Sequence, residues 1–171
     1  LANKYMLRTR PQAISEVVEL FNQTAIEVCE GQQYDMDYEK LADITIDDYI
    51  EMIRLKTAVL LAASLKTGAI VAGAASVDCD HIYRFGINIG LAFQLKDDLL
   101  DVYGVQEKFG KLSGGDIIAG KKTYLYLKSL ESAGSTTDYF RELYTSQSKD
   151  SAEKVLKVKE IFNQLNIERS E

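Results

Sequence analysis

Apolar residues recur along most of the chain at intervals of three and four, and the alternation typical of strands is scarce. The first such pattern predicts a helix from about Gln12 to Glu30, which Gly31 ends. The predicted apolar stripe of this helix consists of Ile14, Val17, Val18, Phe21, Ala25 and Val28.

A second helix is predicted to begin at Thr45, which suits the N-cap position, with Asp47 and Asp48 in the first turn. This position explains the two acidic residues better than a metal cluster does. The helix should continue past Lys56 and Thr57 and break near Gly68 or Gly73.

The stretch from Thr57 to Val77 is almost wholly apolar and is long enough to cross a bilayer. Lys66 lies near its middle, where a lysine costs about 2.5–3.5 kcal/mol on insertion scales. Most other residues of the stretch are small. We therefore interpret it as a closely packed helix of a helical protein, and we expect no integral membrane segment.

Asp78 or Asp80 is predicted to cap the next helix, which ends near Tyr103 and Gly104. Residues 105–120 are polar and rich in glycine, which predicts a mobile loop. Amphipathic helices follow at about 121–132, 136–147 and 151–166. Residues 1–171 therefore form one all-α domain in this interpretation.

The composition is that of a soluble globular protein, since 46% of the 171 residues are hydrophobic and 27% are charged. The formal net charge of −6 argues against nucleic-acid binding, which requires a basic surface. Cys29 and Cys79 lack metal-site spacing and are expected to be reduced thiols. No basic segment followed by an apolar core marks a secretion signal, so a cytoplasmic location is expected.

The most informative chemistry lies in residues 94–101. On a helix, Gln94, Asp97, Asp98 and Asp101 fall within an arc of roughly a third of a turn. Like charges this close cost helix stability, so the cluster favours a bound cation. Carboxylates without nearby His or Cys suit a hard ion, and Mg²⁺ that is also bound to a diphosphate needs only a few carboxylates.

Four blocks along the chain point to one family: Glu30–Met36, Lys56–Thr57, Phe93–Asp101, and Gly110–Asp116 followed by Gly120–Thr123. Their order and spacing resemble the trans-isoprenyl diphosphate synthases, which include farnesyl, geranylgeranyl and longer polyprenyl diphosphate synthases. The resemblance implies an all-α helical bundle of the isoprenoid-synthase type. It also implies Mg²⁺-dependent condensation of isopentenyl diphosphate with an allylic diphosphate.

The resemblance further assigns roles to individual residues. Asp97, Asp98 and Asp101 match the second aspartate-rich motif, in which Asp97 is the surest direct Mg²⁺ ligand. Lys56, Lys111 and Lys121 match diphosphate-contacting lysines, although Lys122 lies one residue from the matching position. The remaining matches line the reaction cavity: Gln32, Asp35, Thr57 and Gln94 as polar residues, and Phe93 as a wall of the isopentenyl site.

The family needs two aspartate-rich clusters, and this sequence contains one. The first cluster would precede Leu1, so we expect the chain to be the C-terminal part of a larger synthase and to be inactive alone. Missing helices should leave an apolar surface exposed around Val59–Val77, and we expect a homodimer, as the family forms.

Two other functions remain open. A terpene cyclase of related helical fold ionises the same substrates, although the block from Gly110 to Lys121 favours a synthase. A non-catalytic subunit of a prenyl synthase would also lack one acidic cluster. The chain length of the product and the preferred allylic primer are not predicted.

Overall fold

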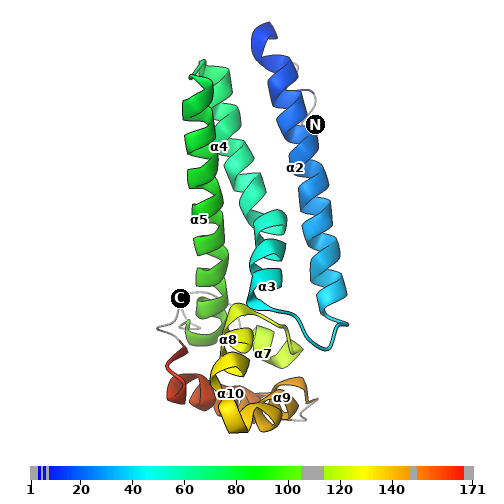
Figure 1. Ribbon diagram of the computed structural model, residues 1–171, viewed down its shortest axis with the longest axis vertical. Helices are drawn as coiled ribbons and strands as arrows, with labels where there is room; N and C mark the ends of the chain where they lie inside the picture. Colours follow the sequence, from blue (N-terminus) through cyan, green and yellow to red (C-terminus); the bar gives the residue numbers. More distant parts are fainter. Residues whose placement is uncertain (1–3, 5, 7, 105–113, 147–149, 168–171) are drawn as a thin grey trace. The chain divides into compact units, whose positions relative to one another are not determined.

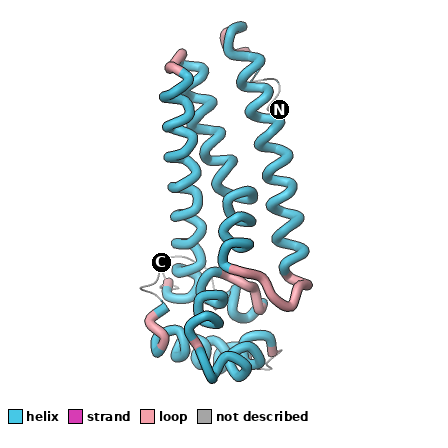
Figure 2. The backbone as a smooth tube through the Cα atoms, in the orientation of Figure 1, coloured by secondary structure: helices cyan, strands magenta, loops and turns pink. Residues whose placement is uncertain are grey.

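The computed structural model describes residues 4, 6, 8–104, 114–146 and 150–167, and within these residues every regular element is helical (Figures 1 and 2). The predicted all-α fold class is therefore confirmed. The elements are α2 (Pro11–Tyr38), α3 (Ile46–Ile53), the π-helical turn η1 (Arg54–Ala58), α4 (Val59–Ala72), α5 (Ser76–Tyr103), α7 (Gly115–Ala119), α8 (Tyr124–Ser132), the 3-10 turn η2 (Gly134–Thr136), α9 (Thr137–Thr145) and α10 (Ser151–Gln164).

Contacts divide the chain into two compact units. The first unit comprises Leu1–Asp37 and Ile50–Gln94, and the second comprises Tyr38–Tyr49 and Leu95–Glu171. Helices α3 and α5 each begin in one unit and end in the other. The single helical domain stays a prediction.

In the first unit, α5 lies close to η1 and α4 (Figure 1), because glycines on α5 face an alanine at the end of η1 and another on α4. A Cβ atom on Gly86 would lie 2.5 Å from the Cα of Ala62, and one on Gly90 would lie 2.5 Å from the Cα of Ala58. Ala58 and Ala62 are fully buried. The small residues of the apolar stretch thus serve close helix packing, as predicted.

Gly31 does not end α2, contrary to the prediction, because the helix continues to Tyr38. Instead, Gly31 is buried against the π-helical turn, and a Cβ atom there would lie 2.8 Å from the carbonyl carbon of Leu55. The predicted apolar stripe is also wrong in part, since Phe21 is 38% exposed and Ala25 is exposed. The buried residues of α2 are Ala13, Val17, Thr24 and Gly31.

Helix α3 begins as predicted. The Thr45 backbone N–H and hydroxyl both donate to the Asp48 carboxylate, at 2.8 and 2.7 Å. The Asp48 N–H donates in return to the Thr45 hydroxyl oxygen at 3.1 Å, which completes a capping box. The helix then runs from Ile46 to Ala72 and ends at Gly73, whose φ of 85° provides the left-handed C-cap.

The segment Ile46–Ala72 is long and apolar enough to cross a membrane, and within the described residues it is the one helix that meets this criterion. One such helix is weak evidence, because core helices of other proteins have the same composition. The prediction that Asp78 or Asp80 caps the next helix is wrong, because the helix begins before both residues. Helix α5 begins at Ser76, with Asp78 in its first turn, and Asp80 forms an ion pair with Lys66 at 2.7 Å.

The second unit is built around buried aromatic rings from α8, α9 and α10. Tyr126, Phe140, Tyr144 and Phe162 are at most 2% exposed, and the centroids of the contacting rings lie 4.3–6.1 Å apart. Helices α8, α9 and α10 confirm the three predicted amphipathic segments. The predicted loop 105–120 is wrong for residues 115–119, which form α7, while residues 105–113 lie outside the described part of the chain.

Replacing Gly31 by alanine is expected to reduce the free energy of unfolding by about 1–3 kcal/mol, because the new methyl group would overlap the backbone of Leu55. Gly68 provides the matched control. It lies inside α4 with open space around it, so Gly68→Ala should stabilise the protein by up to about 1 kcal/mol. Urea unfolding of both variants checks this, and equal effects would contradict the packing role of Gly31.

The capping box should also make stability depend on pH. Hydrogen bonds from Thr45 lower the pKa of Asp48 below its ordinary value of 3.8. Because the folded-state pKa is lowered, this contribution is fully present above pH 4 and is lost as the pH falls through the folded-state pKa. The stability difference between the wild type and Asp48→Asn should therefore shrink as the pH falls from 4 to 2. A constant difference would contradict the role of the ionised carboxylate.

Candidate functional site

In the first unit, the π-helical turn η1 contains Lys56 and Thr57, two of the residues that the sequence singles out. Such turns insert one extra residue into a helix and occur frequently at functional sites. The Lys56 ammonium forms an ion pair with Asp35 of α2, with Nζ 2.6 Å from Oδ2. Both side chains are about one third exposed, so this ion pair remains accessible from solvent.

Thr57 contacts α5, which contributes residues up to Gln94 to the same unit. Its hydroxyl donates to the side-chain oxygen of Gln94 on α5 at 3.3 Å. Four predicted residues, Asp35, Lys56, Thr57 and Gln94, are thus brought together as two contacting pairs that link α2, η1 and α5. This arrangement was not evident from sequence spacing, because the pairs join residues 21 and 37 positions apart.

Gln32 and Phe93 belong to the same unit and are both exposed. Gln32 lies three residues before Asp35 on α2, so the two share a helix face. Phe93 directly precedes Gln94 and is 63% exposed, which is unusual for a phenylalanine. The cavity-lining roles of Gln32 and Phe93 stay predictions.

In the second unit, the three carboxylates of the acidic motif have different surroundings. Asp97 is exposed. Asp98 is only 4% exposed and accepts a hydrogen bond from the hydroxyl of Tyr49. Asp101 accepts a hydrogen bond of 2.9 Å from the backbone N–H of Asp116, near the start of α7. Burial raises the pKa of Asp101, and the neighbouring Asp116 carboxylate adds to the rise, while backbone N–H donors oppose it.

No group of three or more His, Cys, Asp or Glu residues gathers as a metal site in the part of the chain that the structure describes. The donor chemistry of Asp97 nevertheless fits Mg²⁺. This ion prefers oxygen ligands, keeps several waters, and is commonly bound by one or two carboxylates together with substrate phosphates. The assignment of Asp97, Asp98 and Asp101 to the metal stays a prediction.

The structure separates the roles of the neighbouring Lys121 and Lys122. The Lys121 side chain is 55% exposed and lies 2.9 Å from the carboxylate of Asp116. Lys122 donates to the backbone oxygens of Tyr38 and Glu39, at 2.8 and 3.3 Å, and so caps the C-terminal end of α2. Burial lowers the pKa of Lys122. Of the two lysines, Lys121 is therefore the one whose charge faces solvent.

Three further residues hold these groups in place and were not assigned roles from the sequence. Tyr144 is fully buried, and its hydroxyl donates a hydrogen bond of 2.8 Å to the backbone oxygen of Lys121. Burial raises the pKa of Tyr144 far above its usual range, so the hydroxyl stays a donor. The others are Asp116 and Tyr49. Asp116 ends one of the sequence blocks, which was a usable signal, whereas a buried tyrosine in α3 gave none.

Lys111, the third lysine that the sequence assigns to the diphosphate, lies outside the described residues.

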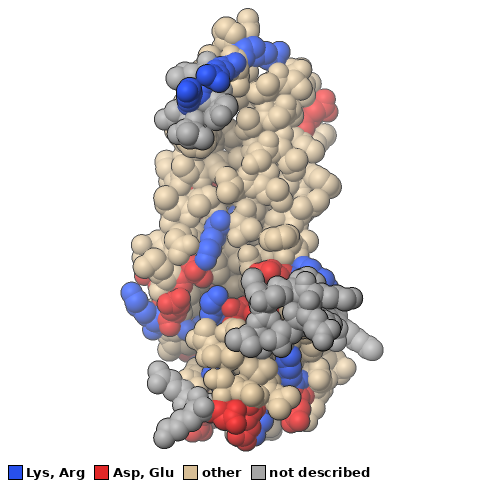
Figure 3. All heavy atoms as spheres, turned by 180° about the vertical axis from the view of Figure 1, so that it is seen from behind, with Lys and Arg blue, Asp and Glu red and all other residues tan. Residues whose placement is uncertain are grey.

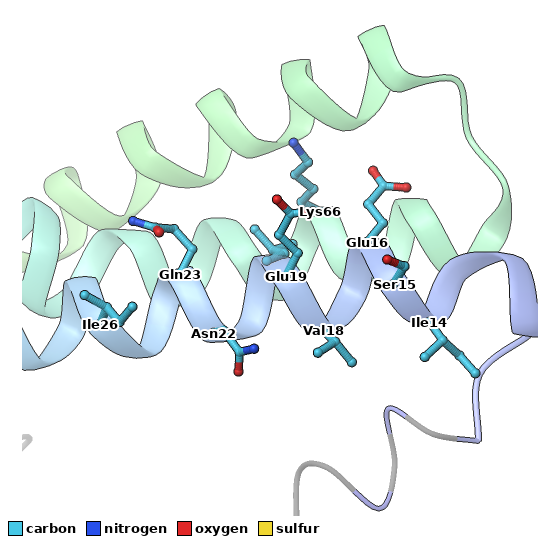
Figure 4. Close-up of a pocket in the computed structure, with 10 residues that line it drawn as sticks. Ile14, Ser15, Glu16, Val18, Glu19, Asn22, Gln23, Ile26 and Lys66 are labelled. Atoms are coloured by element: carbon cyan, nitrogen blue, oxygen red, sulfur yellow. The ribbon is translucent and has the colours of Figure 1, made fainter.

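A separate groove of about 790 Å³ lies along α2 in the first unit (Figure 4). The side chains of Glu16, Glu19 and Gln23 lie on the same side of α2 as Lys66, whereas Ile14 points away (Figure 4). None of the groove residues is one of the predicted site residues. Ile26, the groove residue nearest to them in sequence, precedes Gln32 by six positions, about 9 Å along the helix.

The first unit also exposes large apolar side chains on α4 and α5, where few charged side chains are visible (Figure 3). Leu60 and Val77 are 55% and 57% exposed, and Phe85 and Ile89 are 54% and 43% exposed. An exposed apolar surface was expected around Val59–Val77, and it extends further along α5 than expected.

A model of the family described as polyprenyl synthetase matches residues 1–165. The chain belongs to this family. The resemblance inferred from the four sequence blocks is therefore confirmed, and it extends over nearly the whole chain.

Individual relatives agree with this assignment. The chain is 41% identical over 122 residues to a short chain isoprenyl diphosphate synthase of Methanothermobacter thermautotrophicus, a match that covers 71% of this chain and 38% of that protein. The crystal structure of a geranylgeranyl pyrophosphate synthase superposes with a TM-score of 0.93 at 40% identity, covering 99% of this chain and 53% of that one.

A second solved structure is the geranylgeranyl pyrophosphate synthase from Corynebacterium glutamicum complexed with isoprenyl diphosphate and magnesium. It has a TM-score of 0.84 at 28% identity and covers 95% of this chain and 46% of that one. The chain thus spans about half the length of these two solved synthases, and it matches 38% of the length of the Methanothermobacter relative.

The two lysines should differ in their contribution to stability. Lys122→Ala is expected to reduce the free energy of unfolding by about 1–2 kcal/mol, because two backbone oxygens at the end of α2 lose their donor. Lys121→Ala should change it by less than about 0.5 kcal/mol, since an exposed ion pair contributes little. Urea unfolding measures both, and a larger loss for Lys121→Ala would contradict this assignment.

Proposed function

We propose that this chain carries the diphosphate-binding and metal-binding residues of a prenyltransferase that condenses isopentenyl diphosphate with an allylic diphosphate. The observation that carries the proposal is the pairing of Lys56 with Asp35 and of Thr57 with Gln94 around a π-helical turn. These residues come from three of the sequence blocks that match the family, and they lie in two contacting pairs in the folded chain.

The reaction needs no protein nucleophile. An allylic diphosphate ionises to a carbocation, and the double bond of isopentenyl diphosphate attacks that cation. The protein must therefore stabilise the departing diphosphate and keep water away from the cation. Lysines suit the first task, because a compact ammonium pairs with phosphate oxygens.

Lys56 and Lys121 are the described lysines that we assign to the diphosphate. Each is held by a carboxylate, Lys56 by Asp35 and Lys121 by Asp116, so each ammonium is oriented before an anionic ligand arrives. The exposure of these side chains leaves room for phosphate oxygens beside them. The Thr57 hydroxyl and the Gln94 side-chain oxygen supply partial negative charge that can face a developing cation.

Mg²⁺ bound at Asp97 would neutralise charge that develops on the departing diphosphate. We assign direct binding to Asp97 because this carboxylate is exposed, whereas Asp98 and Asp101 accept hydrogen bonds from the protein. We further propose that the protein acts in the cytoplasm as a homodimer. Since the sequence contains one aspartate-rich motif, the 171 residues alone should not turn over substrate.

The full-length protein, incubated with Mg²⁺, labelled isopentenyl diphosphate and geranyl or farnesyl diphosphate, should form longer labelled products. Asp97→Ala and Lys56→Ala should each lower kcat by about 10²–10³, the usual cost of losing one group that stabilises transition-state charge. Asp47→Ala is the matched control, because Asp47 is an exposed aspartate outside the motif and its loss should leave kcat unchanged.

Product extension that survives both Asp97→Ala and Lys56→Ala would contradict the assignment. Wild-type protein that forms cyclic hydrocarbons without extension would instead identify a terpene cyclase. A folded protein that neither extends nor cyclises any primer would favour a non-catalytic subunit of a prenyl synthase.

A further inference from the structure

Tyr49, a residue of α3, contacts the acidic motif through its hydroxyl group. It donates a hydrogen bond to the carboxylate of Asp98, and each residue is 4% exposed. Both belong to the second unit. A charge-assisted hydrogen bond in such a dry environment is strong, and a buried carboxylate that loses a donor is costly.

The position of the Tyr49 hydroxyl is itself fixed. The backbone N–H of Tyr49 donates to the carbonyl oxygen of Thr45 at 3.1 Å, in the first turn of α3. That turn is locked by the capping box between Thr45 and Asp48. Since the tyrosine ring is rigid beyond two torsions and is buried, its hydroxyl offers a fixed point to which α5 is attached.

Anchoring Asp98 determines where its neighbour lies. Successive residues on a helix point about 100° apart, so holding Asp98 in the protein interior turns Asp97 outward. Asp97 is indeed exposed. The hydrogen bond from the Asp116 N–H to Asp101 fixes the next turn of α5 in the same way. Two carboxylates of the motif thus orient the helix, and the third is presented to solvent.

We propose that Tyr49 is a positioning residue for the metal site, acting by holding Asp98 so that Asp97 meets the metal in the correct orientation. Asp98 is then an anchored hydrogen-bond acceptor and not a direct metal ligand. This inference rests on the proposed function, because it takes Asp97 as the residue that binds the metal–diphosphate complex. Residues that orient a metal ligand typically contribute 10–100-fold to metal affinity.

The test measures Mg²⁺ binding to the full-length protein by calorimetry in the presence of inorganic pyrophosphate, with no turnover involved. Tyr49→Phe removes only the hydroxyl oxygen and should weaken Mg²⁺ binding 10–100-fold. Tyr126→Phe is the matched control. Tyr126 is a similarly buried tyrosine of the same unit, packed in the aromatic cluster, and its substitution should leave Mg²⁺ affinity unchanged.

A second pair of variants separates an anchored acceptor from a metal ligand. Asp98→Asn retains a side-chain oxygen that can accept the Tyr49 hydrogen bond, so it should keep Mg²⁺ affinity within about threefold. Asp97→Asn should lose at least tenfold, because it removes the charge of the direct ligand. Combining Tyr49→Phe with Asp98→Ala should weaken binding no more than Asp98→Ala alone, since both act through one contact.

Unchanged Mg²⁺ affinity in Tyr49→Phe, or a loss in Asp98→Asn as large as in Asp97→Asn, would overturn the inference. If Tyr49→Phe fails to fold, the comparison of Asp98→Asn with Asp97→Asn decides the question. Wild-type protein that binds no Mg²⁺ with pyrophosphate would reject the proposed function itself, together with the inference that rests on it.

Discussion

The close approach of α2 to the π-helical turn at Gly31 is the contact on which the arrangement of the candidate site residues in the first unit depends. Any side chain at Gly31 would meet the backbone and side chain of Leu55, so only glycine allows this spacing. Asp35 lies four residues later on the same helix face, and Lys56 follows Leu55 directly. The 2.6 Å ion pair between them therefore requires the backbone contact one turn earlier. The extra residue of the π-helical turn is the second requirement, because it sets the directions of Lys56 and Thr57.

The second unit achieves its order through buried hydroxyl groups and backbone donors. Tyr49 holds Asp98, the Asp116 N–H holds Asp101, and Tyr144 holds the carbonyl oxygen of Lys121. Each of these contacts is local to the unit, and the first and last of them leave the Asp97 carboxylate and the Lys121 ammonium exposed. The three carboxylates of the motif therefore differ in the structure: Asp97 is exposed, whereas Asp98 and Asp101 accept hydrogen bonds.

Sequence patterns predicted the helical fold, Thr45 as the cap of α3 and the C-terminal ends of α4 and α5, because these depend on local periodicity and local hydrogen bonds. They failed at Gly31, where a rule for helix ends was applied to a glycine that serves a contact between helices distant in sequence. They also failed to identify Tyr49 and Tyr144, since nothing in the local sequence distinguishes a tyrosine that holds a functional group from one that fills the core. The sequence motif favoured Lys121 over Lys122, but only the tertiary contacts of Lys122 with Tyr38 and Glu39 show what Lys122 does instead.

The most direct test of this account is a crystal structure of the full-length protein with Mg²⁺ and a non-hydrolysable thio analogue of an allylic diphosphate. The account predicts a diphosphate oxygen within hydrogen-bonding distance, about 2.7–3.0 Å, of the Lys56 ammonium, with the π-helical turn and the Gly31 contact unchanged. A diphosphate bound away from Lys56, with Lys56 still engaged only by Asp35, would contradict it.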